Sequence, residues 1–213
     1  MRVAVVTESS AARRNGDIIE ALSPFQFEIV NAGMKSPDDP PLNYIQTAFL
    51  GALLLNAGRA DYLVGGCGTG QGFFNAVLQY PHVVCGLVTE PLDAWLFARV
   101  NVGNCVSLSL NQGYGWAGEV NLQLMFQSLF ASASEVGYPP HRREVQQEGR
   151  DMLAQLTAVA HRSMTEIVSL IDASIVDPVL QFPGVWELLG VGTLADRELA
   201  RALEARHAVG ATR

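Results

Sequence analysis

The chain has 213 residues, 49% hydrophobic and 16% charged, which suits one globular domain with a sizeable core and an extension. The formal net charge of −7 argues against a general nucleic-acid or anionic-membrane surface. No stretch fits a signal peptide or a membrane span, and three cysteines without a CxxC pair suit reduced thiols, so we expect a cytoplasmic protein.

The first part of the chain alternates between strand-like and helix-like segments. Short apolar runs predict strands at residues 3–6, 27–31, 61–66, 83–88 and 104–110. Helices are expected between and after them, at residues 9–22, 44–56, 71–78, 91–100 and 119–133, the first capped by Ser9 and Ser10. This alternation predicts an α/β fold: a three-layer α/β/α, Rossmann-like domain with a five-stranded parallel sheet.

The sequence changes character after residue 137. Residues 144–175 have helical periodicity, DPVLQFPG at 177–184 predicts a turn-rich break, and a last amphipathic helix is expected near 194–208. This part is short of core material of its own. We therefore divide the chain into an α/β domain at 1–137 and a helical extension at 138–213, which packs on the core or across a homodimer.

A glycine-rich loop, GGCGTGQG at 65–72, follows the third expected strand. Parallel sheets bind ligands at the carboxyl ends of their strands, and glycines let main-chain N–H groups approach an anion. The spacing is not the dinucleotide pattern GxGxxG, and no GK[ST] follows, which excludes a P-loop. The loop therefore predicts a small anionic ligand held over Cys67.

Cys67 is the reactive side chain of this loop. N–H groups at the start of a helix stabilise a thiolate, which could serve as a nucleophile or as a proton-transfer base. The alternative is a turn in which Cys67 is merely small. Cys85 and Cys105 lie in apolar strands and are expected in the core, whereas His161 and His207 are expected to be solvated on the helical extension.

Two segments, GRADYLVGGCGTGQG and TEPLDAWLFARVNVGN, together resemble the ribose-5-phosphate isomerase B family, which includes galactose-6-phosphate isomerase subunits. The resemblance rests on CGTG-x-G at a strand end, an EP dipeptide and N-x-x-N downstream, and it extends over about residues 1–135. It implies an aldose–ketose isomerase of a phosphorylated sugar that needs no metal or other cofactor. It also implies a homodimer with active sites at the subunit interface.

The resemblance assigns roles to the glycine loop. Cys67 would be the base that moves a proton between C1 and C2 of the sugar, and Thr69 would act beside it. The N–H groups of Gly68, Gly70 and Gly72 would stabilise the enediolate, which accords with the preference of oriented N–H groups for an oxyanion that forms only during reaction.

Further matches concern substrate binding. Tyr44 falls where the family has a substrate-contacting tyrosine, and Asn101 matches an asparagine of the family's H-N motif. The segment HRREVQQEGR offers Arg142, Arg143 and Arg150 in the region of the family's phosphate-binding arginines. The alternative for these arginines is a solvated start of a helix.

The chain departs from the family at two places. The family's Asp-His after the first strand is Glu8-Ser9, where Ser9 is expected to contact the substrate, and its ring-opening histidine is Val100. Glu8 or His141 would then open the ring, or the substrate is already open-chain, or isomerisation has been lost. Glu8 is the preferred candidate, since the end of the first strand opens onto the ligand crevice.

Two other functions stay open at this stage. Because Val100 cannot transfer a proton, the chain is alternatively a non-catalytic or partner-dependent subunit that binds a sugar phosphate. Cys67 is alternatively a nucleophile that forms a covalent intermediate in another reaction.

Overall fold

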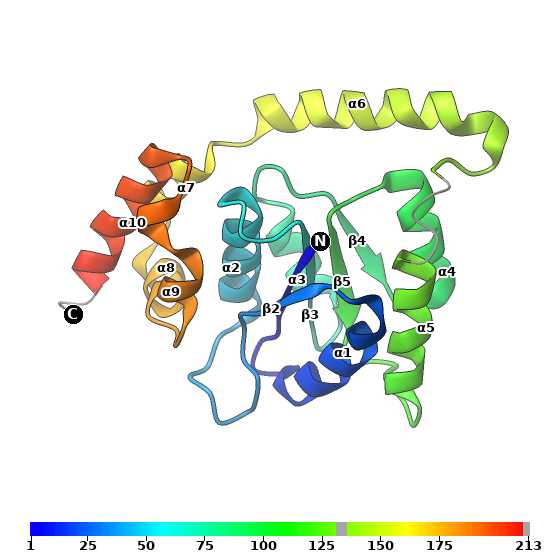
Figure 1. Ribbon diagram of the computed structural model, residues 1–213, viewed down its shortest axis with the longest axis horizontal. Helices are drawn as coiled ribbons and strands as arrows, with labels where there is room; N and C mark the ends of the chain where they lie inside the picture. The colour runs from blue at the N-terminus through cyan, green and yellow to red at the C-terminus, as the bar shows by residue number, and fades with distance from the viewer. Residues whose placement is uncertain (131–135, 211–213) are drawn as a thin grey trace.

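The computed structural model describes residues 1–130 and 136–210. Its centre is a five-stranded sheet in the order β2-β1-β3-β5-β4, and every neighbouring pair of strands is parallel (Figure 1). The strands are β1 (Arg2–Val6), β2 (Glu28–Asn31), β3 (Tyr62–Cys67), β4 (Cys85–Val88) and β5 (Cys105–Ser109). The predicted parallel sheet is confirmed.

Helices cover both faces of the sheet. Two helices, α2 (Tyr44–Asn56) and α3 (Gln71–Val77), pack on one face, and the other face is covered by α1 (Asn15–Leu22), α4 (Pro91–Leu96) and α5 (Gly118–Phe130). Short turns of helix are η1 (Ala12–Arg14), η2 (Ser23–Phe25) and the π-helical η3 (Phe97–Asn101). Because both faces are covered, β1 is apolar without alternation, and residues 3–6 are fully buried.

The C-terminal extension consists of helices. They are η4 (Pro140–Arg142), α6 (Arg143–Ala160), α7 (Met164–Leu170), α8 (Ala173–Leu180), α9 (Val185–Leu189), η5 (Val191–Thr193) and α10 (Arg197–Gly210). The last part of this extension packs on α2, with α8 against α2 and α10 against α7 and α8. Side chains such as Val176 and Leu203 belong to the same apolar cluster as α2. This explains why α2 is apolar all round: the sheet covers one side and the extension covers the other.

Helix α6 is different, because none of its residues is buried. It lies beside the segment that leads into β4, at the amino edge of the sheet, and connects the side of α5 to the side of α7 (Figure 1). Its apolar side chains are therefore exposed in the single chain.

Two details of the predicted helices differ from the structure. Ser9 and Ser10 do not cap a helix, since α1 begins at Asn15 and Ser10 is bonded instead to the carboxylate of Glu8, two residues before it. The segment expected at 91–100 is α-helical only to Leu96 and continues as the π-helical η3. The last residues of the helix expected at 119–133, from 131 on, lie outside the described residues.

The break expected at DPVLQFPG begins later than predicted, because α8 continues through Pro178 to Leu180 and the turn follows at residues 181–184. A proline inside a helix has no N–H for the carbonyl four residues before it. That carbonyl, on Ser174, accepts a hydrogen bond from Gln46 Nε2 of α2 at 2.9 Å. Packing on α2 thus satisfies the group that the proline leaves, which the local sequence could not reveal.

The other two thiols, and the imidazoles of His161 and His207, are at least partly buried. Cys105 is fully buried as expected, and Cys85 is half-buried on the edge strand β4. The two tail histidines are not simply solvated: His207 stacks on Trp186 with ring centroids 3.9 Å apart, and Nδ1 of His161 is buried. None of the helices within residues 1–130 and 136–210 combines the length and apolar character needed to span a membrane.

Candidate active site

The strand order reverses between β1 and β3. From these two central strands the chain extends outward in opposite directions, to β2 on one side and to β5 and β4 on the other. Ligands of parallel sheets bind at the carboxyl ends of strands at such a point. Glu8 follows β1 and Cys67 ends β3, so the topology brings these two predicted residues to one edge of the sheet.

The loop after β3 holds the Cys67 thiol close to Thr69. The side chain of Cys67 is 7% exposed, and its sulfur lies 4.0 Å from Thr69 Oγ1. The carbonyl of Cys67 accepts hydrogen bonds from the N–H groups of Leu110 (3.1 Å) and Gly70 (3.3 Å), which fix the loop. Thr69 Oγ1 accepts a hydrogen bond from Gln71 N at 3.3 Å, so its own proton can be donated to the sulfur or to a ligand.

A buried carboxylate supports this loop through a serine. Glu8 is 6% exposed, and both its oxygens accept from Ser10: Oε1 from the hydroxyl, and Oε2 from the main-chain N–H at 3.0 Å. Ser10 Oγ in turn accepts a hydrogen bond from Gly68 N at 3.1 Å. In this arrangement Glu8 acts on the glycine loop through Ser10, whereas the sequence led us to expect a carboxylate facing the ligand.

Ser10 and Asn111 belong to the site but were missed from the sequence. Asn111 Nδ2 donates to the carbonyl of Ser10 at 2.8 Å, and Asn111 N donates to the carbonyl of Gly68 at 3.0 Å. The loops after β1, β3 and β5 are therefore joined. One signal was available, because Asn111 follows the fifth expected strand and the carboxyl ends of parallel strands lie at one edge.

The N–H groups of the loop differ in what they can offer a ligand. Gly68 N already donates to Ser10, and Gly70 N donates to the carbonyl of Cys67. Within the part of the chain that the structure describes, the N–H groups of Thr69 and Gly72 donate to no other group. Of the three expected donors, Gly68, Gly70 and Gly72, only Gly72 therefore keeps a free N–H group within the described residues. The N–H group of Thr69, which was not expected, is a second one, and Gly70 supplies the turn at φ +75° before α3.

Tyr44 and Ser9 lie around the same edge. The ring of Tyr44 lies over the start of α3, since a Cβ on Gly72 would be 3.1 Å from its Cδ2, and the side chain is 41% exposed. Ser9 is exposed, and its hydroxyl donates to the carbonyl of Leu42 at 2.9 Å.

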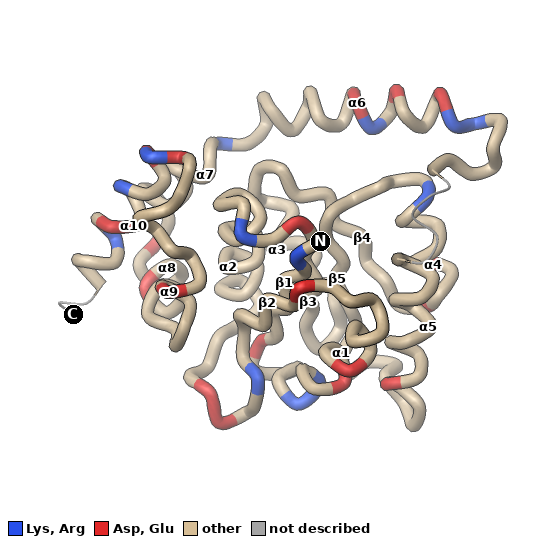
Figure 2. Tube along the Cα trace, in the orientation of Figure 1, with Lys and Arg blue, Asp and Glu red and all other residues tan. Residues whose placement is uncertain are grey.

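The other expected residues lie at the opposite edge of the sheet. Asn101 ends η3, ahead of the first residue of β5, and is exposed. Arg150 Nη1 donates to the carbonyl of Val100 at 2.8 Å, and Arg143 Nε donates to the carbonyl of Val136 at 2.7 Å. Arg142 precedes α6, along whose first half basic and acidic residues are interspersed (Figure 2). One chain does not bring these residues to Cys67.

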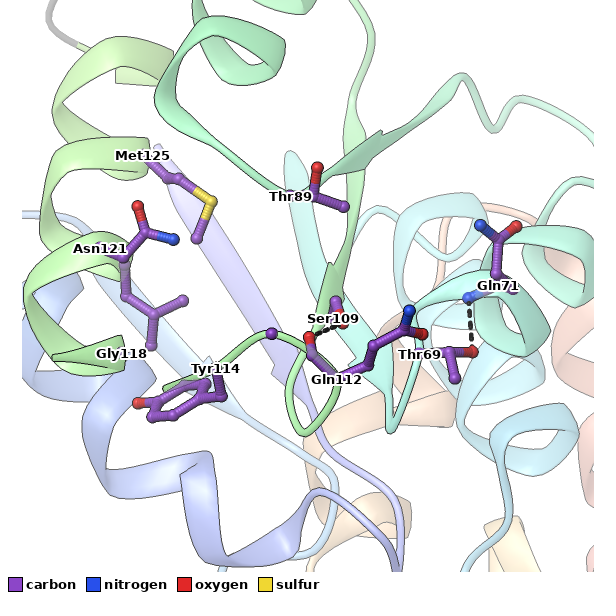
Figure 3. A pocket seen from close by; sticks show the side chains of 11 residues that line it. Thr69, Gln71, Thr89, Ser109, Gln112, Tyr114, Gly118, Asn121 and Met125 are labelled. Atoms are coloured by element: carbon purple, nitrogen blue, oxygen red, sulfur yellow. Dashed lines mark hydrogen bonds between the residues drawn. The ribbon is translucent and has the colours of Figure 1, made fainter. Parts of the chain in front are cut away.

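A pocket of about 320 Å³ opens on the side of the glycine loop that faces α5 (Figure 3). Thr69 lines it, and Tyr114 forms part of its wall. Tyr114 donates to Asp17 Oδ2 at 2.6 Å, while the guanidinium of Arg14 lies 4.0 Å from the ring centroid. Burial, together with this hydrogen bond to Asp17, raises the pKa of Tyr114 well above its ordinary value.

The described residues contain no group of three or more His, Cys, Asp or Glu side chains placed to bind a metal ion.

Comparisons with known proteins agree on one family. Residues 3–146 match the family model for ribose/galactose isomerase. Two solved structures share 31% identity over 97% of this chain and 99% of their own. They are a 4-deoxy-L-threo-5-hexosulose-uronate ketol-isomerase complexed with a tartrate (TM-score 0.89) and a ribose-5-phosphate isomerase from Vibrio parahaemolyticus (TM-score 0.90).

A type B ribose 5-phosphate isomerase from Leishmania infantum has 16% identity and a TM-score of 0.61, and covers 74% of this chain and 96% of its own. That alignment shows the fold alone, whereas the two at 31% identity also take in the helical extension. No curated protein sequence matches the chain.

Proposed function

The chain belongs to the ribose/galactose isomerase family, and from this we propose that it converts an aldose to a ketose with Cys67 as the proton-transfer base. The observation that supports the proposal is the placement of the thiol. Cys67 ends β3 at the edge where the strand order reverses, and its sulfur lies 4.0 Å from Thr69 Oγ1. The same loop carries the N–H groups of Thr69 and Gly72, which donate to no other described group.

The chemistry follows from these groups. The thiolate of Cys67 takes the proton from C2 of the substrate, and the electron pair moves to the carbonyl oxygen to give an enediolate. The N–H groups of Thr69 and Gly72 donate to that oxyanion, which exists only during reaction. The Thr69 hydroxyl exchanges a proton between the two oxygens, and Cys67 returns its proton to C1. No electron leaves the substrate, so the reaction consumes no redox partner.

The two relatives at 31% identity suggest two substrates. A 4-deoxy-5-hexosulose-uronate has no hydroxyl at C4 and a carbonyl at C5, so it lacks the oxygens that close the usual rings of an aldose. Such an open-chain sugar acid needs no ring-opening histidine, and Val100 stands where the family resemblance places that residue. We therefore propose an open-chain sugar acid as the first candidate substrate.

A phosphorylated sugar, such as ribose 5-phosphate, is the second candidate. It requires cations that one chain does not bring to Cys67, since Arg142, Arg143 and Arg150 lie at the opposite edge of the sheet. A second copy of the chain could supply them, and the exposed face of α6 supports such a copy.

Val145, Met152, Leu156 and Val159, the apolar stripe of α6, are between 57% and 82% exposed. With Gly149 they recur at alternating spacings of four and three residues, which is the pattern of a helix that packs against another helix. We propose a homodimer in which the stripe is covered and Asn101 of one subunit completes the Cys67 site of the other.

Light scattering on the wild type and on Leu156→Glu tests this assembly. A dimer that becomes a folded monomer in Leu156→Glu supports the proposal. A wild type that is already monomeric at micromolar concentration contradicts it.

Isomerisation is tested with both candidate sugars and a panel of other sugar phosphates. Cys67→Ala should lower kcat by about 10²–10⁴-fold on the sugar that turns over. Cys85→Ala is the matched control, because that thiol lies on β4 at the far side of the sheet from β1 and should leave kcat unchanged. Undiminished turnover by Cys67→Ala would refute the role of the thiol. Binding of a sugar phosphate without turnover would favour the non-catalytic subunit.

A further inference from the structure

The pocket beside the glycine loop extends from the start of α3, on the thiol's side of the sheet, to α5 on the other side. Cys67 belongs to the apolar cluster on the α2 and α3 face, whereas Leu122 and Met125, which form the apolar part of the pocket, belong to the cluster on the α5 face. Thr69 lies between the two, since it lines the pocket and its hydroxyl lies 4.0 Å from the sulfur. A volume of about 320 Å³ is at the lower end of the range for small-molecule sites.

Three carboxamide side chains from different elements line this pocket: Gln71 at the start of α3, Gln112 after β5, and Asn121 in α5 (Figure 3). Throughout the described ranges, none of these three amide groups forms a hydrogen bond with another protein group. Each offers two donors and one acceptor, which suits hydroxyl and carbonyl oxygens equally.

The pocket has no charge to offer an anion. None of the described residues that line it is a Lys, Arg, His, Asp or Glu. Arg14 lies behind the Tyr114 ring and is 3.6 Å from Asp17 Oδ2, so its charge is already paired. A phosphate or carboxylate in this pocket would lose its hydration without meeting a counter-charge.

The wall of the pocket is packed tightly. A Cβ added to Gly118 would lie 2.1 Å from the Tyr114 ring, so this ring rests directly on the start of α5. Together with its hydrogen bond to Asp17, this contact holds one side of the pocket in place.

We propose that this pocket binds the uncharged, hydroxyl- and carbonyl-bearing part of the substrate, while the reacting carbons lie at Cys67. The link to catalysis rests on the proposed function. The three carboxamide side chains form hydrogen bonds with the oxygens of the sugar, and the C–H faces of the sugar pack on Leu122 and Met125. The substrate class that follows is a sugar whose charged group is at the end directed away from this pocket.

Asn121→Leu tests the proposal by removing one amide at nearly constant volume. The KM for the converted sugar should rise about tenfold, as expected for one lost hydrogen bond, with kcat changed less than twofold. Gln127→Leu is the matched control, since Gln127 is exposed on the same helix and does not line the pocket. An unchanged KM in Asn121→Leu overturns the proposal.

A binding experiment separates this proposal from the proposed function. In Cys67→Ala, D-ribose should shift the NMR signals of the Asn121 side-chain NH₂ group, and inorganic phosphate should not. The absence of a shift with D-ribose, or a shift with phosphate, refutes the pocket assignment. If D-ribose causes the shift but the wild type converts no sugar, the pocket assignment stands and the proposed isomerase activity is refuted.

Discussion

The two edges of the sheet hold the expected site residues in different ways. At the carboxyl edge, hydrogen bonds join Glu8, Ser10 and Gly68. Ser10 N donates to Glu8 Oε2 at 3.0 Å, and Gly68 N donates to Ser10 Oγ at 3.1 Å. At the amino edge, Asn101 is exposed, and Arg150 holds the main chain of η3 to α6. The carboxyl edge is thus organised within one chain, while the amino edge presents its residues outward.

This difference suggests how the site is divided. A group that must be placed accurately relative to the Cys67 thiol is supported by residues of its own chain, through loops that the sheet brings together. Residues at the amino edge cannot reach that thiol in the same chain, because the sheet separates them. If they act on the substrate, they act in a second copy.

Subunit complementation tests this division, with the largest expected effect. Cys67→Ala and Asn101→Ala homodimers should each be nearly inactive. Mixing them in equal amounts under exchange conditions gives heterodimers with one intact site, so activity should recover to about a quarter of that of the wild type. The measurement is the isomerase rate before and after mixing.

Two controls make the result interpretable. Mixing Cys67→Ala with Ser10→Ala, two substitutions at the same edge, should restore no intact site. If the mixture of Cys67→Ala and Asn101→Ala stays inactive while light scattering shows that heterodimers form, the site is not shared between subunits.

The carboxyl edge also shows what the sequence could and could not predict. The parallel sheet followed from apolar strands such as residues 3–6, and the position of Cys67 followed from a glycine loop at a strand end. The hydrogen-bond partners of Ser10 could not be predicted from the sequence. A serine can cap a helix or support Gly68, and which of the two it does depends on which loop lies beside it. The outward position of Asn101 likewise did not follow, because it depends on where the sheet places the end of η3 and not on the local sequence.

Ser10→Ala tests the carboxyl edge itself, with an intermediate effect. It removes the acceptor of Gly68 N and leaves Glu8 with one fewer donor, so the loop that carries Thr69 loses its support. We expect kcat to fall about tenfold, equivalent to one lost hydrogen bond, while the fold is retained. Steady-state kinetics and circular dichroism measure the two effects.

Ser10→Thr keeps the hydroxyl and should restore most of this activity, which a general loss of stability would not allow. Ser23→Ala is the control, because the Ser23 hydroxyl is exposed and donates to the carbonyl of Glu20, away from the glycine loop. Equal losses in Ser23→Ala and Ser10→Ala would show that the hydrogen bond to Gly68 has no special role.

Asp61→Asn tests the amino edge, with the smallest effect. The main-chain N–H of Arg2 donates to Asp61 Oδ2 at 2.7 Å, and the Arg2 guanidinium donates to Oδ1 at 2.9 Å. These two hydrogen bonds join the first residue of β1 to the start of β3. These hydrogen bonds lower the pKa of the Asp61 carboxyl. Because the pair is exposed, solvent screens it, and the urea midpoint at pH 7 should fall by only about 0.2 M.

The pH dependence gives this prediction its direction. A carboxyl whose pKa is lower in the folded state stabilises the fold above its unfolded pKa, and that contribution is lost as the pH falls through the folded pKa. The advantage of the wild type over Asp61→Asn should therefore shrink between pH 7 and pH 3. Asp38→Asn is the control, since no described residue donates a hydrogen bond to that carboxylate. A difference that grows on acidification would show that Asp61 stabilises the protein through something other than its charge.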